Sequence, residues 1–575
     1  MKRDTEKCLF AFHAMPIPNH ILAIPPICAA LGVRYAVTSP GSRSAALTIS
    51  FAEFPDIQTL STRDERVAGY MALGLAQMSK TPVVLICTSG TAALNLAPAI
   101  AEAYFLQVPL LVLTADRPQE WIHQYDGQTI FQDQLFGRHV KKSYQWLPEI
   151  SQEQSWFSHR TLSESIWLTQ TSPAGPVHVN VPIREPFYPE PSDYPLAFPS
   201  ISPIFAQQVQ QVVATDFWSP WLDAMWKSNR PLWVAGQQDN FKFSKALAEL
   251  GNYIPVVGDC ISQLEIASSL HFQDAWSSFL TTQDAPDWFI SSDKSILSKP
   301  LKTFLRNCSA DYHIHVQMSD QWVDPFQSLK EWLAIDPVVV VERILDKIKK
   351  EGVPEQWTNY KKRFDDLEAK VSQFFLSYSS WGNTDASFVQ EFLRQCSADV
   401  ILHGGNSMPI RYLNLFYGSS EGPKVYCNRG TSGIDGSLST AVGSAIADPT
   451  HQHIALVGDV SFWYDSNALW QNQLPSNLKV VLLNNRGGNI FQMIPGPVSQ
   501  PSFKTFFQTE QSLTAEGLSA SFGFAYKGQS RAEISPFDWN EFWTCDHFLV
   551  WEIFTDPSEN QRFMKKWRED LAAQG

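Results

Sequence analysis

Continuous runs of apolar, often β-branched residues recur along the first 190 residues of this chain. The runs at 33–37, 81–87 and 108–115 each lead into a Gly-rich or polar turn, and helix-like segments follow. Such runs alternating with helices are typical of parallel strands covered on both faces of a sheet. After a last run near 177–183 the chain becomes Pro-rich, as domain linkers often are. The pattern predicts a first α/β domain.

Two further stretches of the chain show the same alternation of apolar runs and helix-like segments. Apolar runs within 230–240, 253–259, 287–293 and 311–317 predict a second, weaker set of strands. Residues 346–373 are charged and helical in pattern, which suits a connector. A third set is predicted within 400–413, 453–463 and 478–491, and polar or Gly residues follow each of its strands directly.

We therefore expect an α/β fold of three doubly wound, mostly parallel-sheet domains. Ligands of such sheets bind beyond the carboxyl ends of the strands, where the polar turns lie. The expected domains cover residues 1–195, 196–365 and 366–575.

Composition narrows the class of protein. At roughly 150 residues per domain, 575 residues make three or four domains, and 20 Trp and 37 Phe can fill large cores. A formal net charge of −14 argues against nucleic-acid and anionic-membrane partners, while leaving room for a local basic pocket. No apolar run approaches the roughly 18 residues of a membrane helix, and the N-terminal segment lacks the core of a secretory signal.

The cysteines and histidines give no sign of a metal site. The eight cysteines form no CxxC pair, and none of the 13 histidines falls in a metal-ligand spacing. The cysteines are typical of reduced, mostly buried thiols, so we expect a soluble cytoplasmic protein. His178 alternates with apolar residues and is expected to be structural, while His403 lies just before a polar turn and is not expected to be a catalyst.

Two loops of the third domain carry oxygen ligands. Asp459 follows the strand at 453–457, and Asn484 and Asn485 follow the strand at 479–483. Mg²⁺ prefers hard oxygen ligands and shares its coordination sphere with phosphates and water. Each motif alone is better explained by a helix N-cap or an Asx-turn. The pair, separated by one strand–helix–strand unit, favours a metal–diphosphate site.

Several longer motifs resemble those of one enzyme family. "SPGSRSAALT", "RDERVAGYMALGLA", "CTSGTAALN", "LTADRPQE", "GPVHVNVPIREP", "NRGTSGIDG", "GDVSFWYD" and "NNRGGNIF" are similar to motifs of thiamine-diphosphate enzymes. Within that group the chain resembles the MenD family, the 2-succinyl-5-enolpyruvyl-6-hydroxy-3-cyclohexene-1-carboxylate synthases of menaquinone or phylloquinone biosynthesis. The resemblance covers the first and third domains densely and the middle domain thinly.

The resemblance implies a catalytic role for Glu65. A carboxylate at the pyrimidine nitrogen of the cofactor would favour the imino tautomer that activates the thiazolium carbon, while the protein supplies orientation and electrostatics. The alternative is a Glu that merely favours a helix N-terminus, which is worth roughly 0.3–1 kcal/mol. The family's cofactor lies between two subunits, so a homodimer or a dimer of dimers is expected.

The resemblance also implies a cofactor and metal set. Ile434 is expected to be the apolar wedge under the bent cofactor, with an ordinary core Ile as the alternative. The expected cofactor is thiamine diphosphate with Mg²⁺, or Mn²⁺ as the alternative ion. Its expected binding residues are Glu65, Ser407, Gly433, Ile434, Asp459, Val460, Ser461, Asn485, Gly487, Ile490 and Phe491, with Asp459, Asn485 and Gly487 as metal ligands.

The implied reaction joins two anions, 2-oxoglutarate and isochorismate, with loss of CO₂. Holding several carboxylates in register suits Arg, whose planar fork binds carboxylates bidentately. Arg43 also has a local argument, since a cation at the start of a helix opposes the helix dipole unless an anion is present. The expected substrate set is Ser42, Arg43, Arg117, Gln128 and Lys299 toward isochorismate, and Ser407, Arg411 and Arg429 toward 2-oxoglutarate.

Alternatives and departures accompany these roles. Lys299 could be a solvated loop lysine, and Arg117 could belong to a structural ion pair. Gly127 stands where the family often has Asn, and Arg486 where it often has Asn. The rival functions are another thiamine-diphosphate 2-oxoacid decarboxylase or carboligase, and a non-catalytic relative. A dehydrogenase is disfavoured because no GxGxxG turn follows the first strand.

Overall fold

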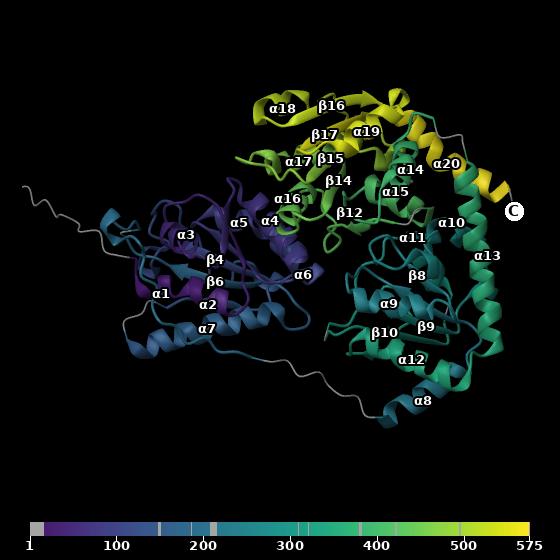
Figure 1. Cartoon of the computed structure of the whole chain (residues 1–575), viewed down its shortest axis with the longest axis horizontal. Coiled ribbons are helices and arrows are strands. Elements are labelled where there is room, and N and C mark those ends of the chain that lie inside the picture. The colour runs from purple at the N-terminus through teal and green to yellow at the C-terminus, as the bar shows by residue number, and fades with distance from the viewer. Residues whose placement is uncertain are drawn as a thin grey trace, which may run out of the picture. The chain divides into compact units, whose positions relative to one another are not determined.

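The computed structural model describes residues 17–147, 151–185, 187–206, 215–308, 310–319, 321–378, 382–419, 422–493 and 496–573. The chain forms two compact units, residues 1–207 and 208–575. Their described parts hold three sheets whose strands all pair in parallel, so the expected α/β fold class is confirmed (Figure 1). The domain boundaries at 195 and 365 stay predictions.

The sheet of the first unit has the strand order β2-β1-β3-β4-β6-β5. The three strands predicted at 33–37, 81–87 and 108–115 lie next to one another at its centre, and their side chains are almost all buried. The two edge strands are short and partly exposed. The strands are β1 (Tyr35–Thr38), β2 (Gln58–Ser61), β3 (Val83–Cys87), β4 (Leu110–Asp116), β5 (Ser143–Gln145) and β6 (Val177–Pro182).

Helices cover both faces of this sheet (Figure 1). Four of them, α1 (Asn19–Leu22), α2 (Ile24–Ala30), α3 (Ala45–Ala52) and α7 (Gln152–Gln170), share one core with one face of the strands. Helix α4 (Glu65–Ser79) packs on β1 and β3, and α6 (Ala97–Leu106) packs on α4. The short α5 (Thr91–Asn95) precedes α6.

The second unit begins with a five-stranded sheet of order β11-β10-β9-β7-β8. Its predicted strands are confirmed, and the short β11 was not predicted. The strands are β7 (Pro231–Ala235), β8 (Val256–Gly258), β9 (Trp288–Ser292), β10 (Tyr312–Val316) and β11 (Glu331–Leu333). The helices around it are α8 (Thr215–Trp226), α9 (Phe241–Leu250), α10 (Gln273–Trp276), α11 (Lys299–Asn307) and α12 (Pro337–Glu351).

The last sheet has the order β13-β12-β14-β15-β17-β16. Its strands are β12 (Val400–Gly404), β13 (Lys424–Tyr426), β14 (Gln452–Gly458), β15 (Leu478–Asn484), β16 (Ala525–Ser530) and β17 (Leu549–Phe554). Its helices are α14 (Asp385–Gln395), α15 (Met408–Phe416), α16 (Ser437–Ala447), α17 (Asp459–Tyr464), α18 (Glu516–Phe522), α19 (Pro536–Thr544) and α20 (Pro557–Ala573). Helices α14, α15, α19 and α20 share a core with one face, and α16 packs on β12, β14 and β15.

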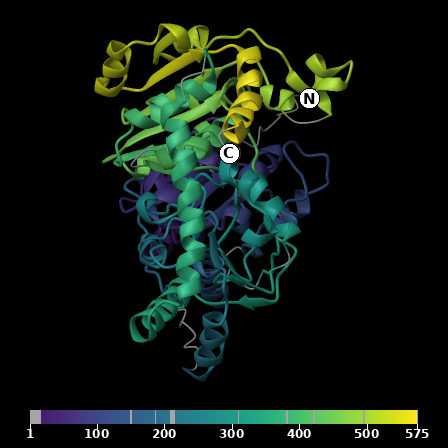
Figure 2. The same ribbon diagram turned by 90° about the vertical axis from the view of Figure 1, so that its right-hand side faces the viewer.

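The predicted connector is a structural element in its own right. Residues 346–373 are helical apart from a break at 352–354. The second of the two helices, α13 (Glu355–Ser377), is a long helix along one side of the second unit, to which it belongs (Figure 2). Its buried face includes Tyr360 and Phe364, which share a core with the middle sheet, and Phe375, which contacts the rings of Phe272 and Phe416. Helix α13 therefore belongs to the core of this unit and does not only connect.

Two expectations from composition can be compared with the described residues. None of the helices there has the length and hydrophobicity of a membrane span. The seven cysteines in this part of the chain carry free thiols, and burial raises the pKa of the Cys28 and Cys87 thiols well above its usual range. Cys8 and the N-terminal segment assessed for a secretory signal lie outside the described residues.

Candidate active site

Four loops of the first unit that carry motif residues follow the carboxyl ends of four neighbouring strands, β2, β1, β3 and β4. Glu65 follows β2, Ser42 and Arg43 follow β1, Gly90 follows β3, and Arg117 follows β4 directly. Because parallel strands end at one edge of the sheet, the loops share that edge. The structure thus brings to one edge the first-unit motifs that the sequence singled out.

Glu65 is the first residue of α4, as the sequence predicts. The preceding Asp64 caps this helix by accepting a hydrogen bond from the Arg66 backbone N–H at 2.9 Å. The half-buried Glu65 carboxylate accepts a hydrogen bond from Asn95 Nδ2 at 3.2 Å and lines a cavity of about 920 Å³ that Gln128 also lines. Asp64 rather than Glu65 therefore caps the helix, and the role of Glu65 toward a ligand stays a prediction.

Gly90 also lines this cavity and lies close to Gln128. Gly90 has φ 86°, and a Cβ there would lie 3.2 Å from the backbone of Gln128, so the loop needs glycine. Its N–H donates to Gln132 Oε1 at 2.9 Å, and the buried Gln132 donates in turn to the Ala115 carbonyl and to Asn180 Oδ1. Gln132 thereby fixes the position of the loop that presents Gln128, an exposed residue with φ 56°.

Arg43 has protein partners. It precedes α3 by two residues and is buried, and its Nη1 donates to the Ile183 carbonyl at 2.8 Å. Its guanidinium also lies 4.4 Å from the Phe187 ring centroid and 3.6 Å from a carboxylate oxygen of Glu185. Burial and then the nearby Arg117 lower the pKa of Arg43, and Glu185 opposes this shift. Arg43 thus already has partners within the protein, and its expected anionic ligand and its role toward substrate stay predictions.

Arg117 is held by the loop that contains the Gly127 departure. Its Nη1 forms an ion pair with Asp126, and its Nε donates to the Gly127 carbonyl at 3.1 Å. The Thr129 hydroxyl also donates to the Asp126 carbonyl at 2.6 Å. Arg117 thus forms the structural ion pair that was the alternative to a substrate role. Gly127 contacts Arg117 through its backbone carbonyl. Ser42 is exposed on the neighbouring loop.

In the second unit, Asp459 begins α17 directly after β14. Its carboxylate accepts hydrogen bonds from the Val460 N–H at 2.8 Å, the Gly487 N–H at 2.7 Å and Gln511 Nε2 at 2.6 Å. Burial raises the pKa of Asp459 to about 6, and these hydrogen bonds oppose the rise. The two predicted metal loops are therefore in direct contact. Gly487 has φ 136°, and a Cβ there would lie 2.6 Å from the Gln508 carbonyl oxygen.

Asn485 is oriented by a buried acid. Its Nδ2 donates to Asp385 Oδ2 at 2.7 Å, which directs Oδ1 away, and this oxygen accepts a hydrogen bond from Asn489 Nδ2 at 2.6 Å. A carboxylate, an amide oxygen and the Gly487 carbonyl make a hard-oxygen set that fits Mg²⁺ and leaves positions for diphosphate and water. No group of three or more His, Cys, Asp or Glu side chains suited to a metal occurs within the described ranges.

The loop at 433–436 is hydrogen-bonded to α17, the helix that begins at Asp459. The Ser461 hydroxyl donates to the Ile434 carbonyl at 2.8 Å, and the Gly433 carbonyl accepts a hydrogen bond from Asn406 Nδ2 at 2.6 Å. Ile434 is half-buried, so its side chain is not an ordinary core residue. Three further predicted residues of this set, all half-buried, are Val460, Ile490 and Phe491.

The predicted cations near 2-oxoglutarate meet around Ser407. Ser407 has φ 76°, an unfavourable value for a non-glycine residue, and its carbonyl accepts a hydrogen bond from Arg411 Nη1. Arg429 Nη1 donates to Asn406 Oδ1 at 2.9 Å, while its buried Nε has no hydrogen-bond partner. Loss of hydration and then Arg429 lower the pKa of Arg411. Two cations held this close to one another favour an anionic ligand.

Lys299 and Arg486 are exposed. Lys299 is the first residue of α11, whose N-cap Ser298 accepts a hydrogen bond from the Leu301 N–H at 3.2 Å. Arg486 has φ 64°, and its backbone carbonyl accepts a hydrogen bond from the Gln511 N–H at 3.3 Å. The Arg486 side chain is therefore exposed while its backbone joins this loop to Gln511.

The two histidines singled out in the sequence have structural partners. His178 is fully buried between the hydroxyls of Thr114 at 2.7 Å and Ser143 at 2.9 Å, and burial lowers its pKa to about 3. The prediction of a structural histidine is confirmed. His403 is also buried, 3.0 Å from the His453 ring nitrogen, and burial and then His453 place its pKa well below its usual value.

Several residues that hold the site together were not predicted. Each is an amide or an acid whose side chain contacts a motif residue, and all but the exposed Asn95 are buried or half-buried. Asn95 and Asn489 lie inside quoted motifs and Asn406 precedes the predicted Ser407, so these three could have been singled out; the sequence around the other three carries no signal. They are Asn95, Gln132, Asp385, Asn406, Asn489 and Gln511.

Family comparisons agree with this geometry. Residues 23–137 match the family model described as "Thiamine pyrophosphate enzyme, N-terminal TPP binding domain", and residues 407–534 match "Thiamine pyrophosphate enzyme, C-terminal TPP binding domain". Thiamine pyrophosphate is thiamine diphosphate. The first match contains Glu65 and its cavity, and the second contains Asp459, Asn485 and Gly487.

Curated relatives match over nearly the whole chain. Three are named 2-succinyl-5-enolpyruvyl-6-hydroxy-3-cyclohexene-1-carboxylate synthase. That of Cytophaga hutchinsonii is 35% identical over 96% of this chain and 98% of its own length, and that of Bacteroides fragilis is 35% identical over 96% and 99%. That of Desulfotalea psychrophila is 35% identical over 95% and 100%. This chain therefore belongs to the 2-succinyl-5-enolpyruvyl-6-hydroxy-3-cyclohexene-1-carboxylate synthase family of thiamine-diphosphate enzymes.

Proposed function

We propose that this protein catalyses the decarboxylation of 2-oxoglutarate and the conjugate addition of the remaining succinyl unit to isochorismate. The products are 2-succinyl-5-enolpyruvyl-6-hydroxy-3-cyclohexene-1-carboxylate and CO₂. The observation that carries the proposal is family membership over nearly the whole chain, together with the cofactor-domain matches around Glu65 and Asp459. The step belongs to menaquinone or phylloquinone biosynthesis.

Thiamine diphosphate, when bound, supplies the reactive carbon and the electron sink for decarboxylation and carbon–carbon bond formation. We propose that Glu65 hydrogen-bonds the pyrimidine nitrogen and holds a proton there. Its place beside a cavity of about 920 Å³, with the helix already capped by Asp64, supports this role. Ile434 would support the cofactor from below, on a loop that Ser461 holds.

We propose that Asp459 Oδ, Asn485 Oδ1 and the Gly487 carbonyl hold Mg²⁺, or Mn²⁺, against the diphosphate. The hydrogen bond from the Gly487 N–H to Asp459 keeps the two loops together, and Asp385 orients the Asn485 amide. The remaining cofactor contacts would come from Ser407, Gly433, Val460, Ser461, Ile490 and Phe491.

The substrate carboxylates would be held by cations. Arg411 and Arg429, with Ser407, are assigned to 2-oxoglutarate, because the cations lie close together and Arg429 keeps a buried N–H without a partner. Ser42, Arg43, Arg117, Gln128 and Lys299 are assigned to isochorismate. Holding both anions before the reaction removes much of the entropic barrier to joining them.

We also propose a cytoplasmic homodimer or dimer of dimers, in which the Glu65 cavity of one subunit faces the Asp459 loops of the other. Exposed apolar side chains support an interface on the first unit, among them Leu94 on α5 and Phe105 on α6. Light scattering of the purified protein at several concentrations should give at least twice the chain mass of 64.8 kDa. A mass of one chain under assay conditions would contradict the shared site.

The function is tested by isochorismate consumption by the purified protein with Mg²⁺ and thiamine diphosphate. Consumption should require both the cofactor and 2-oxoglutarate, with one CO₂ released per isochorismate. Turnover of another 2-oxoacid without isochorismate would indicate a different decarboxylase or carboligase. Cofactor binding without turnover of any 2-oxoacid would indicate a non-catalytic relative.

A further inference from the structure

A short segment of the second unit, residues 271–276, connects helix α13 to two helices that carry predicted substrate cations. The segment contains α10, and it lies between Glu368 of α13 on one side and α11 and α15 on the other. Helix α15 carries Arg411, and α11 begins at Lys299. What fixes these two helices relative to each other therefore decides where the two cations lie.

Asp274 contacts both helices. One of its carboxylate oxygens accepts a hydrogen bond from the Ser298 hydroxyl at 2.6 Å, and the other accepts one from Asn414 Nδ2 at 3.0 Å. Ser298 is the N-cap of α11, and Asn414 lies one turn after Arg411 on α15. A single carboxylate thus joins the residue before Lys299 to the helical turn after Arg411.

Further hydrogen bonds hold the segment around Asp274 in place. Asn414 is buried, and its Oδ1 accepts a hydrogen bond from the Cys260 N–H at 3.1 Å. The buried Asp259 accepts hydrogen bonds from Gln273 Nε2 at 2.6 Å and from the Leu297 N–H. Asp259 therefore holds Gln273, the residue before Asp274, and Leu297, the residue before Ser298. This restrains both partners of the hydrogen bond between Ser298 and Asp274.

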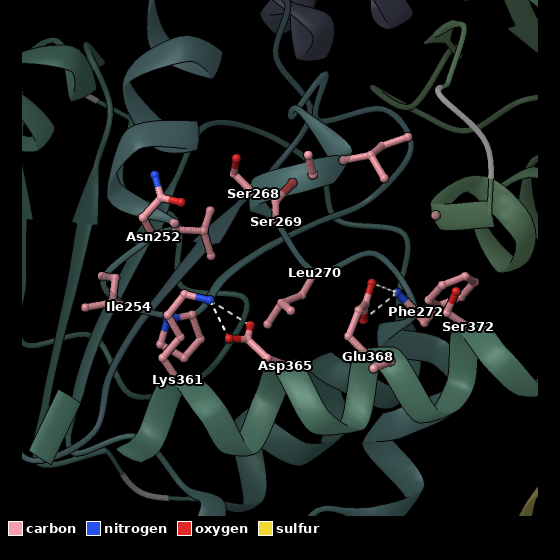
Figure 3. Close-up of a pocket in the computed structure, with 17 residues that line it drawn as sticks. Asn252, Ile254, Ser268, Ser269, Leu270, Phe272, Lys361, Asp365, Glu368 and Ser372 are labelled. Atoms are coloured by element: carbon pink, nitrogen blue, oxygen red, sulfur yellow. Dashed lines mark hydrogen bonds and ion pairs between the residues drawn. The ribbon is translucent and has the colours of Figure 1, made fainter. Parts of the chain in front are cut away.

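Glu368 anchors the segment from the opposite side. Its carboxylate accepts hydrogen bonds from the His271 N–H at 2.6 Å and Trp276 Nε1 at 2.6 Å. It also accepts one from the Phe272 N–H at 3.2 Å (Figure 3). In the adjoining cavity of about 300 Å³, the charges of Lys361 and Asp365 pair with each other (Figure 3). We assign no ligand to this cavity. The contacts of residues 271–276 instead link α13 to α11 and α15.

Electrostatics agree with the geometry. Asp274 opposes the loss of hydration and the repulsion from Arg429 that together lower the pKa of Arg411. It has the same effect on Lys302, one turn after Lys299, whose pKa is lowered first by burial and then by Arg429 and Arg306. Asp274 is thus an acid close to a group of cations, and it holds its own position through neutral partners.

We propose that Asp274 is a positioning residue for the substrate site: through Ser298 and Asn414 it sets the position of Lys299 relative to Arg411. The proposal rests on the proposed function for the identity of the two anions. It does not make Asp274 a group that touches substrate.

The test compares Asp274→Ala with Asp274→Asn in the full-length protein. Ala removes both hydrogen bonds. Asn can still accept from Asn414 and can donate to Ser298, so it retains the geometry without the charge. Losing hydrogen bonds to a charged group should raise KM for both substrates about tenfold in Asp274→Ala, with kcat within about twofold. Asp274→Asn should restore most of the loss. Equal KM values in Asp274→Ala and wild type would overturn the proposal, as would equal damage by Ala and Asn.

Two further variants make the result specific. Asp365→Ala, which breaks the ion pair with Lys361 on α13, should leave both KM values unchanged. A similar rise of KM in that variant would mean that the effect of Asp274→Ala comes from general destabilisation of this region. Ser298→Ala removes the Asp274 contact on the α11 side, together with the N-cap bond to the Leu301 N–H, and leaves the contact to α15. It should raise KM for isochorismate more than for 2-oxoglutarate. An equal rise of KM for both substrates in Ser298→Ala would overturn the assignment of Lys299 to isochorismate. This result can be read even if Asp274→Ala does not fold.

Readouts other than turnover separate this proposal from the proposed function. Hydrogen exchange of a peptide covering 296–307 should be faster in Asp274→Ala than in wild type and unchanged in Asp365→Ala. Calorimetric binding of 2-oxoglutarate should weaken about tenfold in Asp274→Ala alone. Unchanged exchange and binding would overturn the positioning role. Wild-type protein that binds 2-oxoglutarate without consuming isochorismate would overturn the proposed reaction only.

Discussion

Gly487→Ala should disturb the metal loop through two separate effects. At φ 136° an alanine backbone is strained, at about 1–3 kcal/mol. Its Cβ would also lie 2.6 Å from the Gln508 carbonyl oxygen, and because that oxygen is backbone the loop must shift, at a further cost of about 1–3 kcal/mol. The free energy of unfolding should therefore fall by about 2–6 kcal/mol.

The shift should also weaken cofactor binding, because the Gly487 N–H donates to Asp459 at 2.7 Å. Loss of a hydrogen bond to a charged group should weaken binding of Mg²⁺ and thiamine diphosphate about tenfold or more. Tryptophan fluorescence titration measures the binding, and urea unfolding of the unliganded protein measures the stability.

Gly523→Ala is the matched control. Gly523 has φ 78° and no atom within 4 Å of the position that a Cβ would take, so the variant carries the backbone strain without the clash. It should lose about 1–2 kcal/mol of unfolding free energy and bind the cofactor normally. If Gly487→Ala loses no more stability than Gly523→Ala and binds Mg²⁺ as wild type does, the contact between Gly487 and Asp459 does not support the metal site.

Three other predictions concern single residues. Glu65→Gln should lower kcat at least about 100-fold while thiamine diphosphate still binds, because the proton at the pyrimidine nitrogen is lost; full activity would remove Glu65 from the mechanism. Arg429→Ala should raise KM for 2-oxoglutarate more than Kd for thiamine diphosphate; equal effects on both would make the arginine structural. Stability should fall as the pH drops from about 6.5 toward 3, because burial lowers the pKa of His178 to about 3 and only the unfolded chain takes up its proton in that interval. In urea unfolding, His178→Gln should flatten this part of the pH dependence; an unchanged slope between pH 7 and 5 would assign it to other groups.

The sequence predicted the central strands because burial on both faces leaves a continuous apolar run, as in Val83–Cys87. Five strands that were not predicted, β2, β5, β11, β13 and β16, lie at sheet edges. Their exposed positions carry polar residues, as in Gln58–Ser61, so no run marks them. β17 is the exception, since it is interior and its apolar run at 549–554 could have been recognised.

Motif residues at strand ends were predictable because the strand order brings their loops to one edge. Their partners were not. Arg43 donates to Ile183, which lies 140 residues away, and Asp459 is held by Gln511, which lies 52 residues away. Such contacts depend on how distant segments pack, which local patterns do not encode.

The all-parallel pairing of the three sheets has a consequence for how this chain folds. No two of the paired strands can be joined by a tight hairpin, since parallel neighbours need a crossover connection of a dozen or more residues. Pairing must therefore wait until distant segments have been synthesised, and topologies of this kind fold slowly. In the meantime apolar strands such as Val83–Cys87 are exposed to other chains. The yield of this protein should consequently depend on the rate of synthesis and on chaperones as much as on the stability of the finished fold.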